Sequence, residues 1–173
     1  AYALSGAGTY NYVNGQWINN LDEQALEIAK AAVSELDEYL YTTSSLADLE
    51  YSLELPETTT SEILAKVAAI NEALNALVIA KIEIEGKGRY ESIYEAVESA
   101  EDEDIIKLLA DITDAGNYTG NVTKDITINL NGKNLTVKSF VVTANLTIMD
   151  SNPVVDNGNK LEFTTNESGI LVK

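Results

Sequence analysis

The spacing of the apolar residues changes near Gly86, and this change constrains the fold more than any other feature of the sequence. Before Gly86, apolar residues recur every three or four positions, which is the spacing of an amphipathic helix. After it, short runs rich in Ile, Val and Thr are separated by Asn and Gly, a pattern typical of strands joined by turns. The sequence therefore predicts an α+β chain in which helices come first and strands follow.

The strongest helical segment is predicted over residues 60–81. Its apolar residues follow the spacing 4-3-4-3 and comprise Ile63, Val67, Ile70, Leu74 and Leu77. So narrow a stripe is typical of a helix that packs against another helix, because a helix facing a globular core shows a wider apolar face. The other helix can belong to the same chain or to another copy. We favour a homo-oligomer, and within that class a trimer, with these five residues as its seam.

An earlier helix is predicted to begin at Asn20-Leu21-Asp22-Glu23, which resembles a capping box with an acidic first turn. A second heptad-like stripe follows it, formed by Leu26, Ala29, Val33, Leu36 and Leu40. Together the two stripes predict that residues 21–85 form a helical region for oligomerisation or anchoring.

Residues 1–20 are predicted to form an N-terminal arm or hairpin. Asn14-Gly15 is a typical two-residue hairpin turn, and the segment contains the only Trp of the sequence. Tyr10, Tyr12 and Trp17 are candidate docking residues, because exposed aromatic side chains often mark a binding surface. The alternative is that the hairpin covers the end of the neighbouring helix.

The composition argues against several classes of function. The 173 residues include 28 acidic and 11 basic side chains, a formal net charge of −17, so the surface should repel nucleic-acid phosphates. The sequence has no His and no Cys, which removes the commonest general base, the thiolate nucleophile and the usual zinc ligands. No apolar run reaches the about 18 residues of a membrane span. We therefore expect a protein that is not an enzyme, uses no cofactor or metal, binds no nucleic acid and does not insert into membranes.

Residues 86–173 are predicted to contain a short helix over residues 90–100 and then short strands. The strands are expected at residues 105–109, 122–130, 134–137, 140–142, 146–149, 160–164 and 170–172. Strands this short and regularly spaced suit a solenoid, a sandwich or a small barrel, and spacing alone does not choose among them. The acidic run at residues 101–104 matches no calcium-loop spacing and is interpreted as a solvated turn.

The order of these segments resembles a known fold. The helix at 90–100, the strand at 105–112 and the strand that ends in Leu130-Asn131-Gly132-Lys133 are similar to the opening of a pectate-lyase-like right-handed β-helix, a module of phage fibres and bacterial surface proteins. The resemblance covers residues 90–152 and implies that residues 86–173 form a short β-solenoid with a capping helix. Enzymes of this fold use Arg, Lys, His and clustered Asp. This chain has a single Arg, Arg89, and no His, so no catalytic residue carries over.

The N-terminal half resembles phage head-fibre proteins, in which a segment like residues 61–77 forms an oligomeric stalk or capsid anchor. This resemblance implies a non-enzymatic structural protein of the virion surface, a head fibre or capsid decoration protein. Its N-terminal part would bind a capsid or other virion protein, and its β part would project. The alternative is a β-helix module of a secreted bacterial adhesin, located outside the cell or on its surface, that binds a host-surface glycan or protein.

Overall fold

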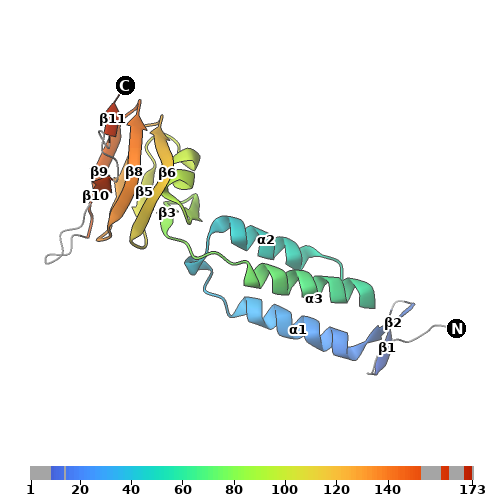
Figure 1. Cartoon of the computed structure of the whole chain (residues 1–173). Coiled ribbons are helices and arrows are strands. Elements are labelled where there is room, and N and C mark those ends of the chain that lie inside the picture. The colour runs from blue at the N-terminus through green and yellow to red at the C-terminus, as the bar shows by residue number, and fades with distance from the viewer. Residues whose placement is uncertain (1–8, 14, 153–160, 164–169, 173) are drawn as a thin grey trace. The chain divides into compact units, whose positions relative to one another are not determined.

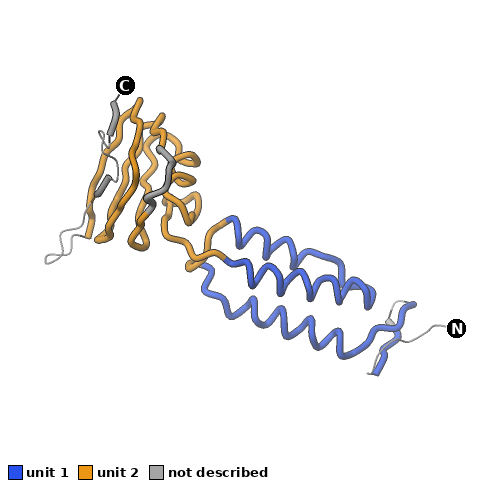
Figure 2. Tube along the Cα trace, in the orientation of Figure 1, with its two compact units in different colours: residues 1–38, 44–77 blue, residues 39–43, 78–173 orange. Residues whose placement is uncertain are grey.

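The chain divides into two compact units, each with its own apolar core (Figure 2). The computed structural model describes residues 9–13, 15–152, 161–163 and 170–172. Residues 1–38 and 44–77 make up the helical unit, and residues 39–43 and 78–173 make up the β unit. The predicted boundary at residue 86 therefore lies inside the β unit.

The helical unit consists of a β-hairpin followed by helices (Figure 1). Its elements are β1 (Tyr10–Val13), β2 (Gln16–Asn19), α1 (Asn20–Ser34), α2 (Thr43–Glu54) and α3 (Thr60–Asn75). β1 and β2 pair antiparallel, and Gly15 in the turn has a φ of 86°, which suits glycine. Figure 1 shows α1 and α3 running in one direction and α2 in the other. Every helix in the described ranges is too short or too polar to cross a bilayer.

Side-chain caps determine where α1 and α3 begin. Asn19, rather than the predicted Asn20, caps α1 by accepting a hydrogen bond from the Leu21 amide at 3.1 Å. Thr59 and Glu62 form a capping box at α3. The Glu62 amide donates to Thr59 Oγ1 at 3.2 Å, and the Thr59 amide donates to Glu62 Oε2 at 2.9 Å. These bonds satisfy amides that have no partner within the helix.

Both predicted helical stripes face the core of the helical unit, except for Leu40, which is exposed in the 3-10 helix at residues 38–40 and belongs to the β unit. Its buried residues come from β2 and the helices and comprise Ile18, Leu26, Ala29, Leu49, Ile63, Ile70 and Ala73. Val33 and Leu36 of the first stripe pack against this core while remaining partly exposed. The helix-on-helix packing that the heptad spacing indicates therefore occurs within one chain.

The β unit contains short strands and one described helix of its own. A 3-10 helix, η1 (Glu38–Leu40), follows α1 and spans the boundary between the units in the sequence. The remaining elements of the β unit are β3 (Ile82–Ile84), β4 (Gly88–Tyr90), α4 (Ile93–Ser99), β5 (Ile105–Leu108), β6 (Ile112–Val122), β7 (Ile126–Asn129), β8 (Leu135–Val142), β9 (Leu146–Met149), β10 (Leu161–Phe163) and β11 (Ile170–Val172). Buried and partly exposed residues alternate along β3 and β5, as expected for strands with one face in a core.

The described strands of the β unit form two sheets around one core. One sheet has the order β4-β3-β5-β7-β9, in which β5, β7 and β9 are parallel and β3 is antiparallel to β4 and β5. In the other, β8 pairs in parallel with β6, β10 and β11. Residues of both sheets and of α4 share a single cluster that includes Ile93, Ile106, Ile128, Leu135 and Phe140.

The prediction of a right-handed β-helix for residues 86–173 is wrong. The described strands form separate small sheets, none of them closed or curled into a solenoid. An antiparallel hairpin, β3 and β4, begins one sheet, and β10 and β11 both pair with β8, so the strands do not stack one per coil. The chain is therefore α+β with small open sheets. The alternation of apolar residues identified strands, but it does not specify which strands pair.

Candidate functional site

The hairpin brings together two of the three predicted docking residues. The rings of Tyr12 and Trp17 lie with their centroids 5.0 Å apart and their planes tilted by 52°. The exposed fractions are 62% for Tyr12 and 45% for Trp17, so the pair presents aromatic surface to solvent. Tyr10 lies two residues away on β1, where its hydroxyl accepts a hydrogen bond from Asn19 Nδ2 at 3.4 Å. Tyr10 therefore supports the start of α1, and the exposed pair is Tyr12 and Trp17.

A second apolar stripe lies on the outer side of α1. It has the spacing 4-3-4 and consists of Leu21, Ala25, Ile28 and Ala32, which we call the α1 stripe. Leu21 is 49% exposed and Ile28 is 72% exposed, although Leu26 and Ala29 of the same helix are buried. This stripe was not predicted, because the residues from Leu26 onward already account for one apolar face of α1. The 4-3-4 spacing was the signal that could have revealed it.

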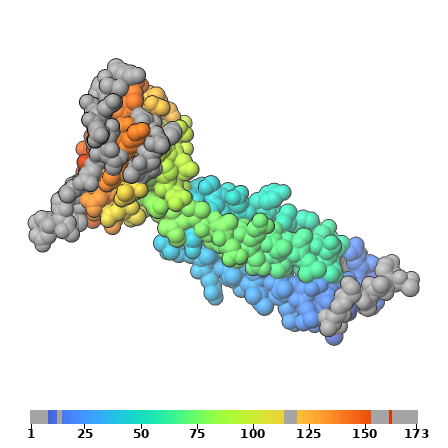
Figure 3. Space-filling view, in the orientation of Figure 1, coloured from blue at the N-terminus to red at the C-terminus, as the bar shows by residue number. Residues whose placement is uncertain are grey.

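The aromatic pair comes just before the α1 stripe in the chain. β2 ends at Asn19 and α1 begins at Asn20, so Trp17 lies four residues before Leu21. The Thr60 hydroxyl donates to the Trp17 carbonyl at 3.3 Å and ties the start of α3 to β2. We call Tyr12, Trp17 and the α1 stripe the hairpin–α1 surface. Part of the α1 surface is visible as the blue region of Figure 3.

The helical unit is strongly acidic, with twelve Asp and Glu against Lys30 and Lys66. Both lysines bind Glu57: Glu57 Oε2 lies 2.7 Å from Lys66 Nζ and 2.9 Å from Lys30 Nζ. The Lys66 ammonium, and after it Lys30, lowers the pKa of Glu57 below its ordinary value. Twelve acidic residues against two lysines leave this unit with an excess of ten acidic residues.

The predicted oligomer seam lies within the chain. Ile63 and Ile70 are buried in the core of the helical unit, and Val67, Leu74 and Leu77 pack against it while partly exposed. A buried side chain is not available to a second copy unless the unit opens. Homo-oligomerisation, including the trimer, stays a prediction, and in this fold it requires a surface other than Ile63 and Ile70.

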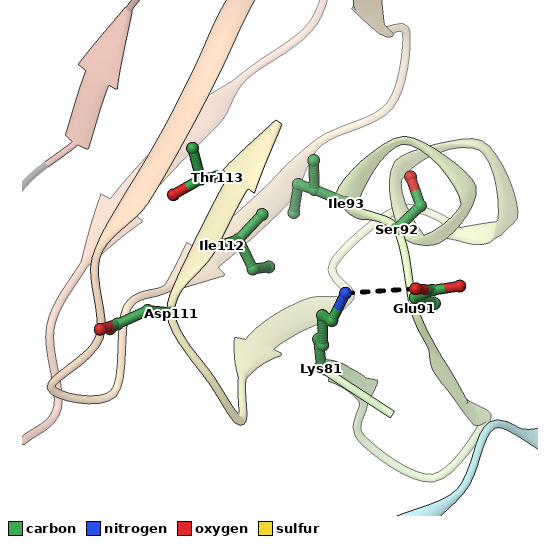
Figure 4. Close-up of a pocket in the computed structure, with 7 residues that line it drawn as sticks. All are labelled: Lys81, Glu91, Ser92, Ile93, Asp111, Ile112 and Thr113. Carbon is green, nitrogen blue, oxygen red and sulfur yellow. Dashed lines mark hydrogen bonds and ion pairs between the residues drawn. The ribbon is translucent and has the colours of Figure 1, made fainter. Parts of the chain in front are cut away.

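A small pocket occurs in the β unit (Figure 4). Its volume is about 160 Å³, and it is lined by Lys81, Glu91, Ser92, Ile93, Asp111, Ile112 and Thr113. Lys81 Nζ lies 3.2 Å from Glu91 Oε1, while Asp111 lies on the other side of the pocket in Figure 4. Asp111 Oδ1 accepts a hydrogen bond from the Asn134 amide at 2.8 Å. The pocket is therefore lined by side chains of both charges, by two hydroxyl groups and by the apolar Ile93 and Ile112.

A second pocket, of about 250 Å³, lies beside the turn at Gly86, and its cations are already engaged. Lys87 Nζ lies 2.8 Å from Asp104 Oδ2, and Asp104 raises the pKa of Lys87. Arg89 Nε donates to the Tyr41 carbonyl at 3.0 Å, and its guanidinium lies 4.9 Å from the ring centroid of Tyr39. These contacts hold β4 in place and account for the positive charge in this pocket.

The predicted solvated turn at residues 101–104 supports its neighbours in the β unit. Asp102 Oδ1 accepts a hydrogen bond from the Asp125 amide at 2.9 Å, and Asp104 Oδ2 accepts one from the Glu101 amide at 2.7 Å. Within the described ranges, no three carboxylates are placed to hold a metal ion together. Asp102 and Asp104 therefore accept hydrogen bonds from backbone amides, and Glu101 and Asp104 also pair with Lys87.

Comparisons with protein families, curated protein sequences and solved structures found no match to this chain. Its function must therefore be inferred from its own surfaces. The hairpin–α1 surface is the stronger candidate, because it combines an exposed aromatic pair with exposed aliphatic side chains of the adjoining helix, whose start is capped. The pocket of Figure 4 is the weaker one, because Lys81 and Asp111 already have partners within the chain.

Proposed function

We propose that the chain is a non-enzymatic structural protein of a phage virion, a head fibre or capsid decoration protein, attached through its helical unit. The observation that carries this proposal is the hairpin–α1 surface, where Tyr12, Trp17, Leu21 and Ile28 are exposed. Several large apolar side chains exposed on neighbouring elements of a folded protein often mark a contact with another protein. In this proposal the contact is with a capsid or other virion protein.

The separation of the two cores supports an anchor joined to a projecting part. The core of the helical unit is built from β2 and the helices, and the core of the β unit from its sheets and α4. Since neither cluster draws residues from the other unit, the hairpin–α1 surface can be buried in a contact without disturbing the β unit. The β unit then presents its strands and turns to the surroundings.

The composition supports a structural rather than a catalytic role. A chain without His or Cys lacks the groups that most often act as general base or nucleophile near neutral pH. The acidic side chains with lowered pKa, such as Glu57 and Asp125, bind lysines or accept hydrogen bonds from the chain itself. Such contacts stabilise the carboxylate form, whereas a general acid needs a raised pKa.

A second candidate is a secreted bacterial surface adhesin whose β unit binds a glycan. The pocket of Figure 4 favours it, because a lining that combines polar and apolar side chains suits a sugar ring. In this case the helical unit acts as a spacer and the binding residues include Asp111 and Thr113. Binding of the full chain to a panel of neutral saccharides, lost in Asp111→Ala, would favour the adhesin.

Immunogold labelling of a culture that expresses the natural gene tests the first proposal. An antibody raised against the β unit is applied to purified phage particles and to the host cell envelope. We expect label on the capsid of the particles. Label confined to the cell envelope would favour the adhesin, and label on neither would contradict both candidates.

A further inference from the structure

We propose that the hairpin–α1 surface binds a cationic amphipathic helix of the partner protein. This inference rests on the proposed function, and it specifies the partner by its chemistry. Two properties of the helical unit carry it: the spacing of the exposed apolar residues along α1, and the excess of acidic over basic residues in the unit.

The spacing of the α1 stripe indicates a helical partner. Leu21, Ala25, Ile28 and Ala32 follow the 4-3-4 repeat of a helix that packs lengthwise against another helix. The small side chains of Ala25 and Ala32 allow a partner backbone to approach closely, and the larger Leu21 and Ile28 fill the spaces between its side chains. Trp17 and Tyr12 add an exposed aromatic pair just before the first turn of α1 in the chain.

The charge of the helical unit indicates that the partner helix is cationic. Twelve acidic residues are set against Lys30 and Lys66, and both lysines are held by Glu57. Glu35, exposed at the end of α1, follows Ile28 by one heptad and so places a carboxylate in line with the stripe. A helix that bears Lys or Arg beside its apolar face would neutralise this field when it docks.

The same charge argues against a second copy of the chain as the occupant. If two helical units associated along α1, the excess acidic residues of each copy would come close to those of the other. Like charges across an interface weaken association. Such repulsion is strongest at low ionic strength, where the screening length is longest. A dimer is therefore the principal alternative, and the oligomeric state discriminates it from the proposal.

A designed peptide pair tests the inference directly. The probe is a synthetic helical peptide without Trp, with Leu and Ala at its heptad positions and Lys elsewhere, and its counterpart carries Glu in place of Lys. Trp17 is the only Trp of the chain and lies on the proposed surface, so its fluorescence reports binding at the site. We expect the Lys peptide to shift the Trp17 emission to shorter wavelength, with an affinity that decreases as salt is added. The Glu peptide should produce no shift.

Matched variants assign the binding to the α1 stripe. Ile28→Ser should lower the affinity for the Lys peptide by about tenfold, since burying an Ile side chain contributes enough free energy for a tenfold change in affinity. Leu64→Ser is the control, because Leu64 of α3 is 49% exposed, as Leu21 is, and lies outside the hairpin–α1 surface. We expect Leu64→Ser to bind like the natural chain. Both side chains face solvent, so circular dichroism should show the helices intact in each variant.

Three results would overturn the inference. They are equal binding of the Lys and Glu peptides, unchanged binding by Ile28→Ser, and, at low ionic strength, a dimer in light scattering that Ile28→Ser abolishes. The immunogold experiment remains independent of all three. Labelled capsids without peptide binding would refute the cationic helix and leave the virion proposal standing, whereas peptide binding without labelled capsids would do the reverse.

Discussion

Replacing Glu57 by Gln should destabilise the helical unit by about 2 kcal/mol, because it removes the charge partner of a buried lysine. Lys66 is only 4% exposed, and its ammonium lies 2.7 Å from Glu57 Oε2. Glu57 also lies 2.9 Å from Lys30 Nζ, so one carboxylate of the α2–α3 connection ties α1 to α3. The variant keeps the size of the side chain and leaves both ammonium groups in place without the negative charge.

The magnitude follows from how much water reaches each partner. Leaving a buried charged group without its partner costs about 1 to 3 kcal/mol, and breaking a fully buried ion pair costs about 3 to 5 kcal/mol. The Glu57 side chain is 42% exposed, so solvent compensates for part of the loss. Lys30 is partly exposed as well, and a pair of that kind contributes less than about 1 kcal/mol. A total near 2 kcal/mol corresponds to a decrease of roughly 8 to 16 °C in the melting temperature of a unit this small.

Thermal unfolding of the full chain, followed by circular dichroism at a helical wavelength, measures the effect. Glu50→Gln is the matched control, because Glu50 is an exposed residue of α2 that makes none of the ion pairs of the described residues. Adding Lys66→Met to Glu57→Gln should restore much of the lost stability, since the buried charge is then gone. Equal melting temperatures for Glu57→Gln and Glu50→Gln would refute the reasoning.

Three further predictions concern acid stability, helix capping and packing. The pKa values of Glu57 and Glu62 are lowered in the folded chain. Their contribution to stability is therefore complete above their ordinary pKa and is lost as the pH falls through the pKa values of the folded chain. The melting temperature should decrease in thermal melts at stepwise lower pH, and an unchanged melting temperature would contradict this prediction. Thr59→Ala should cost about 1 kcal/mol in chemical denaturation of the helical unit, whereas Thr59→Ser should cost little, because serine keeps the capping hydroxyl. Gly120→Ala should destabilise the β unit by about 1 to 3 kcal/mol, because the added Cβ would lie 2.7 Å from Phe140 Cδ1. The backbone amides of the β unit should then exchange their hydrogens faster, and exchange as slow as in the natural chain would disprove the clash.

The sequence predicted the helices better than their ends. The heptad spacing identified α3, and the prediction extended it to Lys81, although the helix ends at Asn75. After that point the backbone pairs with a segment distant in sequence: the Thr42 amide donates to the Val78 carbonyl at 2.8 Å, and the Ala80 amide donates to the Leu40 carbonyl at 2.9 Å. Apolar spacing describes only local sequence, so it could not indicate that these residues leave the helix to pair elsewhere.

The β unit shows the same limit at the level of sheet order. Strands were predicted near β5, β8 and β9, and the Asn131-Gly132 turn was recognised. Asn131 and Gly132 both have positive φ, as such a turn requires. The pairing of β8 with β6, β10 and β11 depends on contacts between segments far apart in sequence. Alternation within one strand contains no information about those contacts, so a solenoid and two open sheets predict the same local pattern.

The candidate docking surface could be predicted only in part for a related reason. α1 carries two apolar stripes of heptad-like spacing, and spacing alone does not tell which one the chain buries. The structure decides, because α3 supplies Ile63 and Ile70 to the stripe that contains Leu26, and the α1 stripe stays exposed.

An exposed stripe of this kind carries a risk of self-association, and the acidic surface around it reduces that risk through repulsion between copies. Repulsion between copies and attraction for a cation have the same electrostatic origin. Neutralising the field should therefore act on both at once. High salt should weaken the binding of the Lys peptide and, at the same time, allow copies of the chain to approach each other along α1. We expect association at high salt that Ile28→Ser prevents and Leu64→Ser leaves unchanged. This result would show that charge, rather than a lack of apolar surface, keeps the copies apart at low salt.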